Sequence, residues 1–382
     1  MTARRLRPFG TTIFTEMSAL AARSNALNLG QGSPDTDGPA EVVEAVTTAM
    51  RSGRANQYAP LAGVPELRAA IAAHQRRRYG IELDPDDGIQ VTFGATEAIA
   101  ATMLGLVEPG DAVVVLEPFY DSYAATIAMA GGERRLVTLR PPDFTVDVDA
   151  LAAAARGARM LLLNSPHNPT GRVLTGDELR AIATICVEHD LVAVTDEVYE
   201  HLVFDGEHVP LATLPGMAER TLTISSAGKS FSFTGWKVGW CCGPPHLVGA
   251  VRAAKQFLSF SGATPFQHAV ATALTDAERH VAPLCASLRA NRDSLCAGLR
   301  AAGFGVSVPQ GTYFVNADVA PLGVDDAAAW CRALPERAGV VAIPTSGFYD
   351  DAQAARTLVR FAFCKRATVI EEAVRRLSAL VG

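Results

Sequence analysis

Short apolar runs separated by amphipathic stretches follow one another along most of the chain, and they predict an α/β fold. The runs are rich in Val, Leu and Ile, which is typical of strands buried on both faces of a parallel sheet. These predicted strands lie at residues 88–93, 111–116, 134–139, 159–164, 191–195, 221–225 and 238–242. Apolar residues at helical spacing predict helices between them, at residues 39–50, 64–80, 94–107 and 177–189.

The pattern changes in the last third of the chain, where helices dominate. Helices are predicted at residues 246–258, 265–298, 325–334 and 368–380, and strands at 313–317, 340–343 and 357–363. The start of the chain adds a helix at 14–23 and a short strand at 26–29. The mixture predicts a large domain at residues 39–262 and a smaller α/β domain at 263–382, which residues 1–38 are expected to join.

Composition narrows the class of protein. The chain has 382 residues, of which 49% are hydrophobic, so it is long enough for two domains and a sizeable core. A net charge of −6 argues against non-specific nucleic-acid binding. No apolar run reaches the length of a membrane span, and the start MTARRLRPFG lacks the apolar core of a secretory signal. We therefore expect a cytoplasmic protein with neither a nucleic-acid nor a membrane partner.

Cysteine and histidine usage points away from disulfides and metals. The seven cysteines are odd in number and form no C-x-x-C pair, which favours buried reduced thiols. Cys241 and Cys242 lie in a predicted strand, so we expect their side chains to point to opposite faces. The eight histidines show no metal-ligand spacing, and no metal site is predicted.

One stretch, SSAGKSFSFTGWKVGW at residues 225–240, has an unusual pair of lysines. Between Thr221 and Gly243, Lys229 and Lys237 are the only charged side chains. Apolar surroundings lower the pKa of a lysine and make it a usable nucleophile, able to form a Schiff base with a carbonyl compound such as pyridoxal phosphate. The alternative is a lysine that extends from a strand end into solvent.

Other polar residues come directly after predicted strands, where ligands collect in doubly wound sheets. Gly94, Ala95 and Thr96 lie between a strand and a helix, and the free N–H groups of a helix start could bind a phosphate. Many strand–helix turns look the same without binding one. Asp196 follows the apolar strand at 191–195, where a carboxylate needs a partner. That partner could be a protonated ring nitrogen, although a helix cap or loop aspartate is an open alternative.

Four more residues could complete such a site. The amide of Asn168, in PHNPTG, could donate to the cofactor's phenolate oxygen or to a substrate carboxylate, or it could simply form a turn. Tyr199 could supply a second donor to the phenolate oxygen. Tyr120, in EPFYDSY, offers a face for a flat ring, although an ordinary core tyrosine is an alternative. Arg360 lies within the apolar run LVRFAF and needs an anion, such as a bidentate carboxylate.

Together these motifs resemble the fold-type I, pyridoxal-phosphate-dependent aminotransferases of class I. The resemblance covers nearly the whole chain, from NLGQG to VRFAFCK, and its motifs SSAGKSFSFTGWKVGW, NSPHNPTG and TDEVYEHL come in the family's order. The chain looks most similar to the actinobacterial N-succinyldiaminopimelate aminotransferases and to the kynurenine, glutamine and methionine aminotransferases. The resemblance implies a mostly parallel seven-stranded sheet in the large domain.

It also implies roles for individual residues. Lys229 would hold pyridoxal 5'-phosphate as a Schiff base and move the substrate's Cα proton. Contacts to the ring, its phenolate oxygen and its phosphate would come from Gly94, Ala95, Thr96, Tyr120, Asn168, Asp196, Tyr199, Ser226 and Lys237. Arg360, Asn168 and the Gly32 backbone would bind the substrate carboxylate. Tyr58 would reach the phosphate of the partner subunit, which implies a homodimer with shared active sites.

Two positions depart from the related sequences. Ser33, in GQGSPD, replaces an aromatic residue beside the substrate carboxylate, and His268, in TPFQHAV, stands where proline is more usual. Both are expected to affect the choice of substrate.

Three hypotheses follow. The first is transfer of an amino group from an L-amino acid to a 2-oxo acid, with N-succinyldiaminopimelate or glutamine-, methionine- or kynurenine-type amino acids as substrates. The second, prompted by Ser33 and His268, is elimination, replacement or carbon–carbon bond formation on the same cofactor. The third is a non-catalytic binding protein on the same fold.

Overall fold

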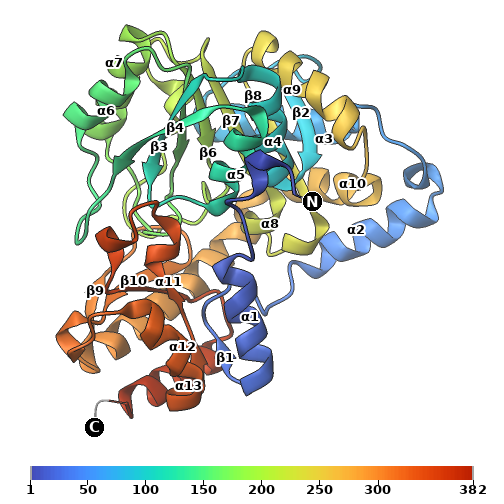
Figure 1. Cartoon of the computed structure of the whole chain (residues 1–382). Helices are drawn as coiled ribbons and strands as arrows, with labels where there is room; N and C mark the ends of the chain where they lie inside the picture. Colours follow the sequence, from blue (N-terminus) through green and yellow to red (C-terminus); the bar gives the residue numbers. More distant parts are fainter. Residues whose placement is uncertain (1, 381–382) are drawn as a thin grey trace.

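The computed structural model describes residues 2–380, and its central feature is a seven-stranded sheet (Figure 1). β8 pairs antiparallel with both of its neighbours, and the other strands run parallel to one another. The predicted mostly parallel sheet is therefore confirmed. Its strands, in order across the sheet, are β2 (Ile89–Phe93), β8 (Val238–Cys242), β7 (Thr221–Ser226), β6 (Val192–Asp196), β5 (Met160–Asn164), β3 (Ala112–Glu117) and β4 (Glu133–Thr138).

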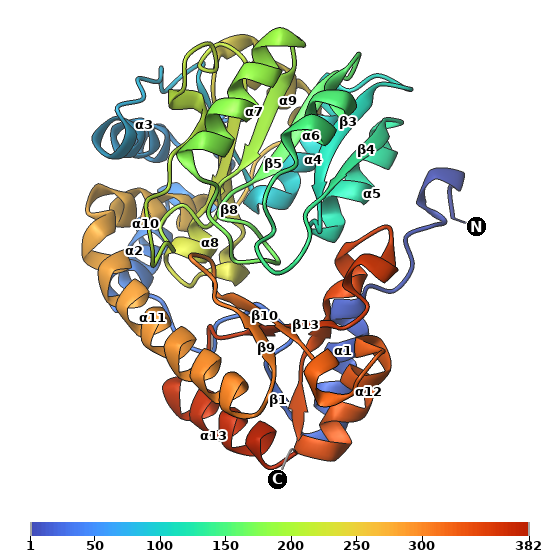
Figure 2. The ribbon, with the colours of Figure 1, turned by 90° about the vertical axis from the view of Figure 1, so that its left-hand side faces the viewer.

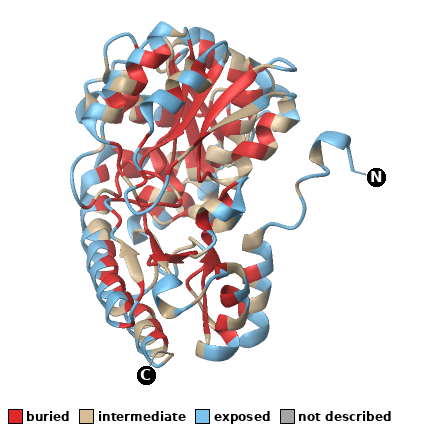
Figure 3. Cartoon of the chain, turned by 60° about the vertical axis from the view of Figure 1, so that its left-hand side comes forward, coloured by how far each residue is buried: buried red, intermediate tan, exposed pale blue. Residues whose placement is uncertain are grey.

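Helices cover both faces of this sheet because its strands are apolar on both sides. In β3, Val113 and Val115 pack against one set of helices, whereas Val114 and Leu116 pack against the other. Cys241 and Cys242 likewise belong to cores on opposite faces, as predicted. Figure 3 shows the strands as the buried centre of the molecule. The first set is α4 (Gly94–Leu106), α5 (Asp121–Ala130) and α9 (Pro245–Leu258), and the second includes α6 (Val148–Ala155) and α7 (Gly176–Glu188).

Local signals fix several helix ends. α7 begins with a capping box, in which Thr175 accepts from the backbone of Glu178 and the Glu178 side chain accepts from the backbone of Thr175. α1 (Ile13–Ser24) begins after the capping hydroxyl of Thr12 and ends at Asn25, whose φ of 50° is left-handed. Within residues 2–380, the helices are too short or too polar to cross a membrane.

A smaller antiparallel sheet forms the second body, which Figure 2 shows below the large sheet. Its order is β12 (Ile343–Pro344), β13 (Leu358–Ala362), β10 (Phe314–Asp318) and β9 (Gly305–Ser307). The N-terminal strand β1 (Leu27–Asn28) pairs in parallel with β11 (Val340–Val341), so the start of the chain lies beside its last third. One core joins α1 to α11 (Ala277–Ala301), α12 (Ala327–Ala338) and α13 (Ala367–Ser378).

The predicted single helix at 265–298 is wrong, because the chain breaks at Asp276. The backbone of Asp276 is not helical, at φ −133° and ψ 59°, and it separates α10 (Thr264–Thr275) from α11. α10 packs against α2 (Ala40–Arg51) and α3 (Pro65–Tyr79), whereas α11 packs against α13. The division into domains at residues 38 and 262 stays a prediction.

Candidate active site

A cavity of about 180 Å³ opens at the carboxyl ends of the parallel strands. Asn164, Asp196 and Ser226 are the last residues of β5, β6 and β7, and all three line it. The structure also brings together the cofactor-binding residues predicted within one subunit. Those lining the cavity are Gly94, Ala95, Thr96, Tyr120, Asn168, Asp196, Tyr199, Ser226, Lys229 and Lys237.

The direction of β8 explains why both lysines reach this edge. β7 ends at Ser226, and the one-turn helix α8 (Ala227–Ser230) then carries Lys229. Lys237, with a left-handed φ of 54°, ends the connection before β8 runs back antiparallel. Because β8 is antiparallel to β7, it starts at the sheet edge where β7 ends. The short connection between them therefore leaves Lys229 and Lys237 at the same edge of the cavity.

Lys229 is half-buried at the cavity wall, and its amine is hydrogen-bonded to a tyrosine. Burial lowers the pKa of the Lys229 amine to about 8. Its Nζ donates to the hydroxyl of Tyr313 at 2.9 Å, and that hydroxyl donates to the carbonyl of Gly32 at 2.8 Å. A fraction of the amine is therefore neutral near pH 8, held by a contact with the smaller body of the protein.

Asp196 is a buried carboxylate that lines the same cavity. Burial raises its pKa to about 6, although the hydroxyl of Tyr123 donates to Oδ2 at 2.6 Å and opposes the rise. The backbone N–H of Val198 donates to Oδ1 at 3.3 Å. Asp196 is thus mostly ionised at neutral pH and places a negative charge in a buried position, which favours a cationic partner.

The start of α4 forms a narrow cradle beside Lys237. Gly94 has a left-handed φ of 67°, and a Cβ there would lie 3.1 Å from the Nζ of Lys237. A Cβ at Gly239, on the neighbouring strand, would lie 2.5 Å from the carbonyl carbon of Gly94. Because Gly94 and Gly239 have no side chains, the first turn of the 13-residue helix α4 stays open next to the ammonium group of Lys237. Free N–H groups and a positive charge together suit a phosphate.

Arg360 is buried on β13 among three aromatic rings. Its guanidinium carbon lies 3.9 Å from the ring centre of Phe314, 4.7 Å from that of Phe348 and 5.2 Å from that of Phe14. Nη1 donates to Oδ1 of Asn168 at 3.0 Å, and Nη2 donates to the carbonyl of Gly30 at 2.8 Å.

The third guanidinium nitrogen of Arg360 makes no hydrogen bond in the described part of the chain. Its Nε is buried and has no hydrogen-bond partner within residues 2–380. Burial lowers the pKa of the guanidinium only to about 10, so it stays charged at neutral pH. A buried cation bonded to neutral oxygens favours an anion, and a carboxylate matches its geometry.

Five predicted residues lie outside the cavity lining in residues 2–380, namely Gly32 and Arg360, described above, and Ser33, Tyr58 and His268. Ser33 contributes its backbone carbonyl, which accepts from the Nζ of Lys365 at 2.5 Å. His268 lies on α10 and lines a separate open groove with Glu41 and Glu66, and its effect on the choice of substrate stays a prediction. Tyr58 is 82% exposed, with its ring 5.8 Å from that of Phe260.

Sequence reasoning missed two tyrosines that touch the central side chains. Tyr123 follows the predicted Tyr120 by three residues on α5, and only the direction of that helix shows that it reaches Asp196. Tyr313 precedes β10 in the smaller sheet, far along the chain from Lys229. An aromatic residue at i+3 was a usable signal for Tyr123, whereas the sequence carries none for Tyr313.

The side chains around the cavity fit pyridoxal phosphate. Asp196 supplies the acidic partner for a ring nitrogen, Lys229 a nucleophilic amine, and Tyr120 an aromatic face. The start of α4, with Ser226 and Lys237, supplies the phosphate cradle.

Comparisons with known proteins agree with this chemistry. Residues 24–377 match the family described as aminotransferase class I and II. The chain is 56% identical to the probable N-succinyldiaminopimelate aminotransferase of Mycobacterium tuberculosis, over all of this chain and 98% of that protein. It is 39% identical to the methionine aminotransferase of Escherichia coli, over 98% and 97% of the two chains. This chain belongs to the class I and II aminotransferases.

The solved structure of the N-succinyldiaminopimelate aminotransferase from Mycobacterium tuberculosis gives a TM-score of 0.97, with all of both chains covered. The resemblance found in the sequence is thereby confirmed. The chain is a fold-type I aminotransferase, and its cofactor is pyridoxal phosphate. The hypothesis of a non-catalytic binding protein is not supported by these findings.

Proposed function

We propose that this aminotransferase moves an amino group from an L-amino acid to a 2-oxo acid with Lys229 as its catalytic residue. The observation that carries the proposal is the Lys229 amine, whose pKa is lowered to about 8, on the same cavity as the ionised Asp196. When bound, pyridoxal phosphate supplies an electron sink for the charge that develops at the substrate's Cα. Asp196 keeps the ring nitrogen protonated, which that sink requires.

Lys229 is the residue that would move the proton at Cα. A neutral amine accepts a proton efficiently when its pKa lies near the working pH, as a value of about 8 does. Tyr313 holds the amine at 2.9 Å and is itself anchored to Gly32. This anchoring limits the directions in which the flexible lysine side chain can point.

Arg360 would bind the α-carboxylate of the amino acid and of the oxo acid. Asn168 would share this task, because it contacts Arg360 and also lines the cofactor cavity. The backbone of Asn168 is held by the side chain of Asn164, its N–H donating to Oδ1 at 2.7 Å. One asparagine thus links the site for the cofactor to the site for the substrate.

We propose N-succinyldiaminopimelate as the first substrate to test, because the relative with 56% identity carries that name. Methionine-, glutamine- and kynurenine-type amino acids are the alternative, and the methionine aminotransferase at 39% identity supports them. Comparing kcat/KM among these donors with 2-oxoglutarate separates the two groups. Elimination or replacement chemistry was suggested by Ser33 and His268, and neither lines the cavity in the described chain.

We further propose a homodimer in which Tyr58 reaches the partner's phosphate. Tyr58 is exposed and its ring contacts that of the exposed Phe260, and Phe257 and Leu258, on the helix before Phe260, are exposed as well. Such a patch favours a second copy of the chain. Mixed dimers of K229A and Y58A should regain activity, because one of their two sites combines an intact Lys229 with an intact partner Tyr58. Mixed dimers as inactive as the parents would contradict the shared site.

The test of the central proposal is K229A. It should abolish both turnover and the visible absorption that depends on the covalent bond between Lys229 and the cofactor, while the variant still folds with a wild-type circular-dichroism spectrum. K237A serves as the matched control, because it removes a lysine from the same edge of the cavity and should weaken cofactor binding without removing the absorption. Unchanged turnover in K229A would refute the assignment.

A further inference from the structure

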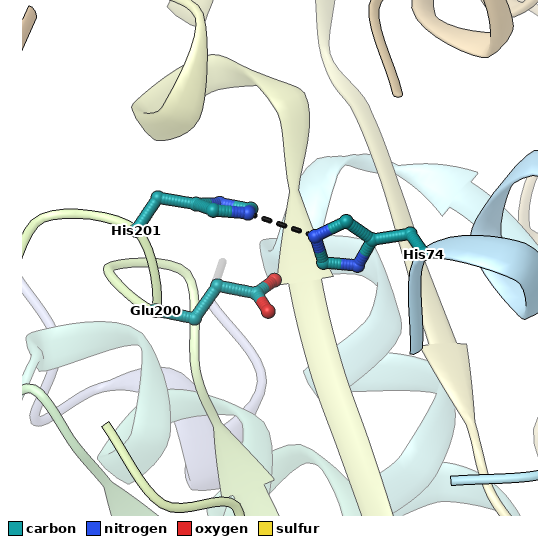
Figure 4. A group of neighbouring side chains, drawn as sticks. All are labelled: His74, Glu200 and His201. Carbon is teal, nitrogen blue, oxygen red and sulfur yellow. Dashed lines mark hydrogen bonds between the residues drawn. The ribbon is translucent and has the colours of Figure 1, made fainter. Parts of the chain in front are cut away.

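A buried polar cluster lies behind the lysine segment, where His74, Glu200 and His201 meet (Figure 4). All three side chains are at most 3% exposed. His74 comes from α3, whereas Glu200 and His201 directly follow Tyr199 in the loop after β6, the strand that ends at Asp196. The rings of His74 and His201 are joined by a 2.9 Å hydrogen bond between their Nε2 atoms.

Two hydrogen bonds connect this cluster to the segment that carries Lys229. The hydroxyl of Ser225 donates to Oε1 of Glu200 at 2.5 Å, and the hydroxyl of Ser230 is bonded to Nδ1 of His201 at 2.7 Å. Ser225 and Ser230 flank Ser226 and Lys229 on either side. The consecutive loop residues Glu200 and His201 therefore bind the two ends of segment 225–230, which carries Lys229.

The segment needs such support because its own secondary structure is minimal. α8 has four residues, and one helical turn is unstable by itself. α3 supports the two holding residues in turn. The hydroxyl of Tyr79 donates to Oε2 of Glu200 at 2.8 Å, and His74 bonds His201.

We propose that Glu200 and His201 are positioning residues that hold Lys229 in register with Asp196 and Tyr199. Since Asp196 ends β6 and the loop directly after it carries Tyr199, Glu200 and His201, the two bonds to Ser225 and Ser230 fix the lysine relative to the ring partners. This inference rests on the proposed role of Lys229.

The charges in the cluster agree with this role. Burial lowers the pKa of His201 to about 3 and also lowers that of His74. Burial would raise the pKa of Glu200, but the nearby imidazoles and the Ser225 hydroxyl outweigh it and hold the pKa at about 2. His201 also faces the charged Arg78 and the ring of His208. At neutral pH the cluster is one anion with neutral rings, and hydroxyl donors satisfy the anion.

Two histidines and a glutamate also have the ligand atoms of a metal site, within 4.8 Å of one another. The bonds already made argue against that use. The two Nε2 atoms that would face an ion are bonded to each other, and both oxygens of Glu200 accept hydroxyl hydrogens. The geometry therefore favours a positioning role, and we call the bonds from Glu200 and His201 to Ser225 and Ser230 the clamp.

Two substitutions at one position test the clamp in the holoenzyme. H201N keeps a polar atom near the position of Nδ1 and should preserve the bond to Ser230. H201Q keeps one near Nε2 and should lose the bond to Ser230. We expect H201Q and S230A to lower kcat about five- to tenfold, with KM for the amino donor within about twofold, as the loss of one buried hydrogen bond implies. H201N should retain most of kcat.

The second readout is the pH titration of the bound cofactor's visible absorption without substrate. H201Q and S230A should shift its midpoint equally, and the double variant should shift it no further. I182A, a core change in α7 that is buried and distant from the cluster, controls for lost stability. Wild-type midpoints and kcat in H201Q and S230A, or shifts that I182A reproduces at the same loss of Tm, would overturn the clamp.

Elemental analysis of the purified enzyme adds a third outcome. One metal ion per chain that is lost in H74Q and H201Q would overturn the clamp in favour of a metal site. Failure of the proposed function looks different, because wild-type protein and K229A would then share the same cofactor spectrum.

Discussion

Replacing Tyr123 with Phe removes one hydrogen bond from Asp196 and leaves the aromatic packing in place. The Tyr123 hydroxyl is buried and donates to Oδ2 at 2.6 Å. A hydrogen bond to a charged group contributes about 1.5–3 kcal/mol, which equals roughly 1–2 pKa units. The pKa of Asp196 is about 6 with this bond, so we expect Y123F to raise it to about 7–8.

The consequence is a change in how cofactor binding depends on pH. In the proposed complex a protonated ring nitrogen would pair with the ionised carboxylate, which would make the pKa of Asp196 lower than in the cofactor-free protein. Affinity is then full above the free-protein pKa and falls by up to about tenfold for each pH unit below it. Titrating cofactor-free protein with pyridoxal phosphate, followed by tryptophan fluorescence, should show this fall beginning about 1–2 pH units higher in Y123F.

Y349F is the matched control. Tyr349 is also buried, but its hydroxyl donates to the backbone carbonyl of Leu139 at 2.9 Å, away from the cavity. Because the titrations of the phosphate and of Lys229 are common to all three proteins, they cancel in the comparison. An identical pH dependence in Y123F and wild type, or an equal shift in Y349F, would refute the reasoning.

Three further predictions concern other residues of the site. R360K should raise KM for amino acid and oxo acid on the order of 100-fold in steady-state assays, because a lysine cannot bind a carboxylate in bidentate fashion; equal loss of cofactor affinity would contradict it. Y313F should lower kcat about five- to tenfold, because Lys229 loses the hydroxyl that orients it, and an unchanged kcat would show that the contact is dispensable. Because the pKa of His201 falls from 6.5 to about 3 on folding, its contribution to stability is full above pH 6.5 and is lost progressively as the pH drops towards 3. Urea unfolding at several pH values should show a weaker acid loss in H201N than in wild type, and equal slopes would contradict this.

The sequence was informative wherever the site depends on strand ends. Asp196 and Gly94 follow apolar runs that could be recognised as parallel strands, and the carboxyl ends of such strands meet at one edge. The positions of polar residues after apolar runs therefore predicted that their side chains lie close together in the fold. Lys229 and Lys237 could be assigned to the same site because the sequence around them has no other charged residues.

The sequence was uninformative where contacts depend on how the two bodies pack. Tyr313 meets Lys229 only because the smaller sheet lies against the edge of the larger one. The bond between His74 and His201 likewise depends on where α3 packs, and neither spacing nor composition indicates it. The break at Asp276 has no glycine or proline at that position, whereas Pro283 lies inside α11 without ending it. Tertiary packing overrides the local signals at these positions.

The pairing of β1 with β11 has a consequence for how the protein forms during synthesis. Leu27 pairs with Val340, so the first strand waits for its partner while almost the whole chain is made. At roughly 5–20 residues per second, that wait lasts tens of seconds. The large sheet is complete by Cys242, and it can fold while the N-terminal segment is still unpaired. The nascent chain should therefore assemble the proposed phosphate cradle first, and the Gly30–Arg360 contact of the proposed carboxylate site last.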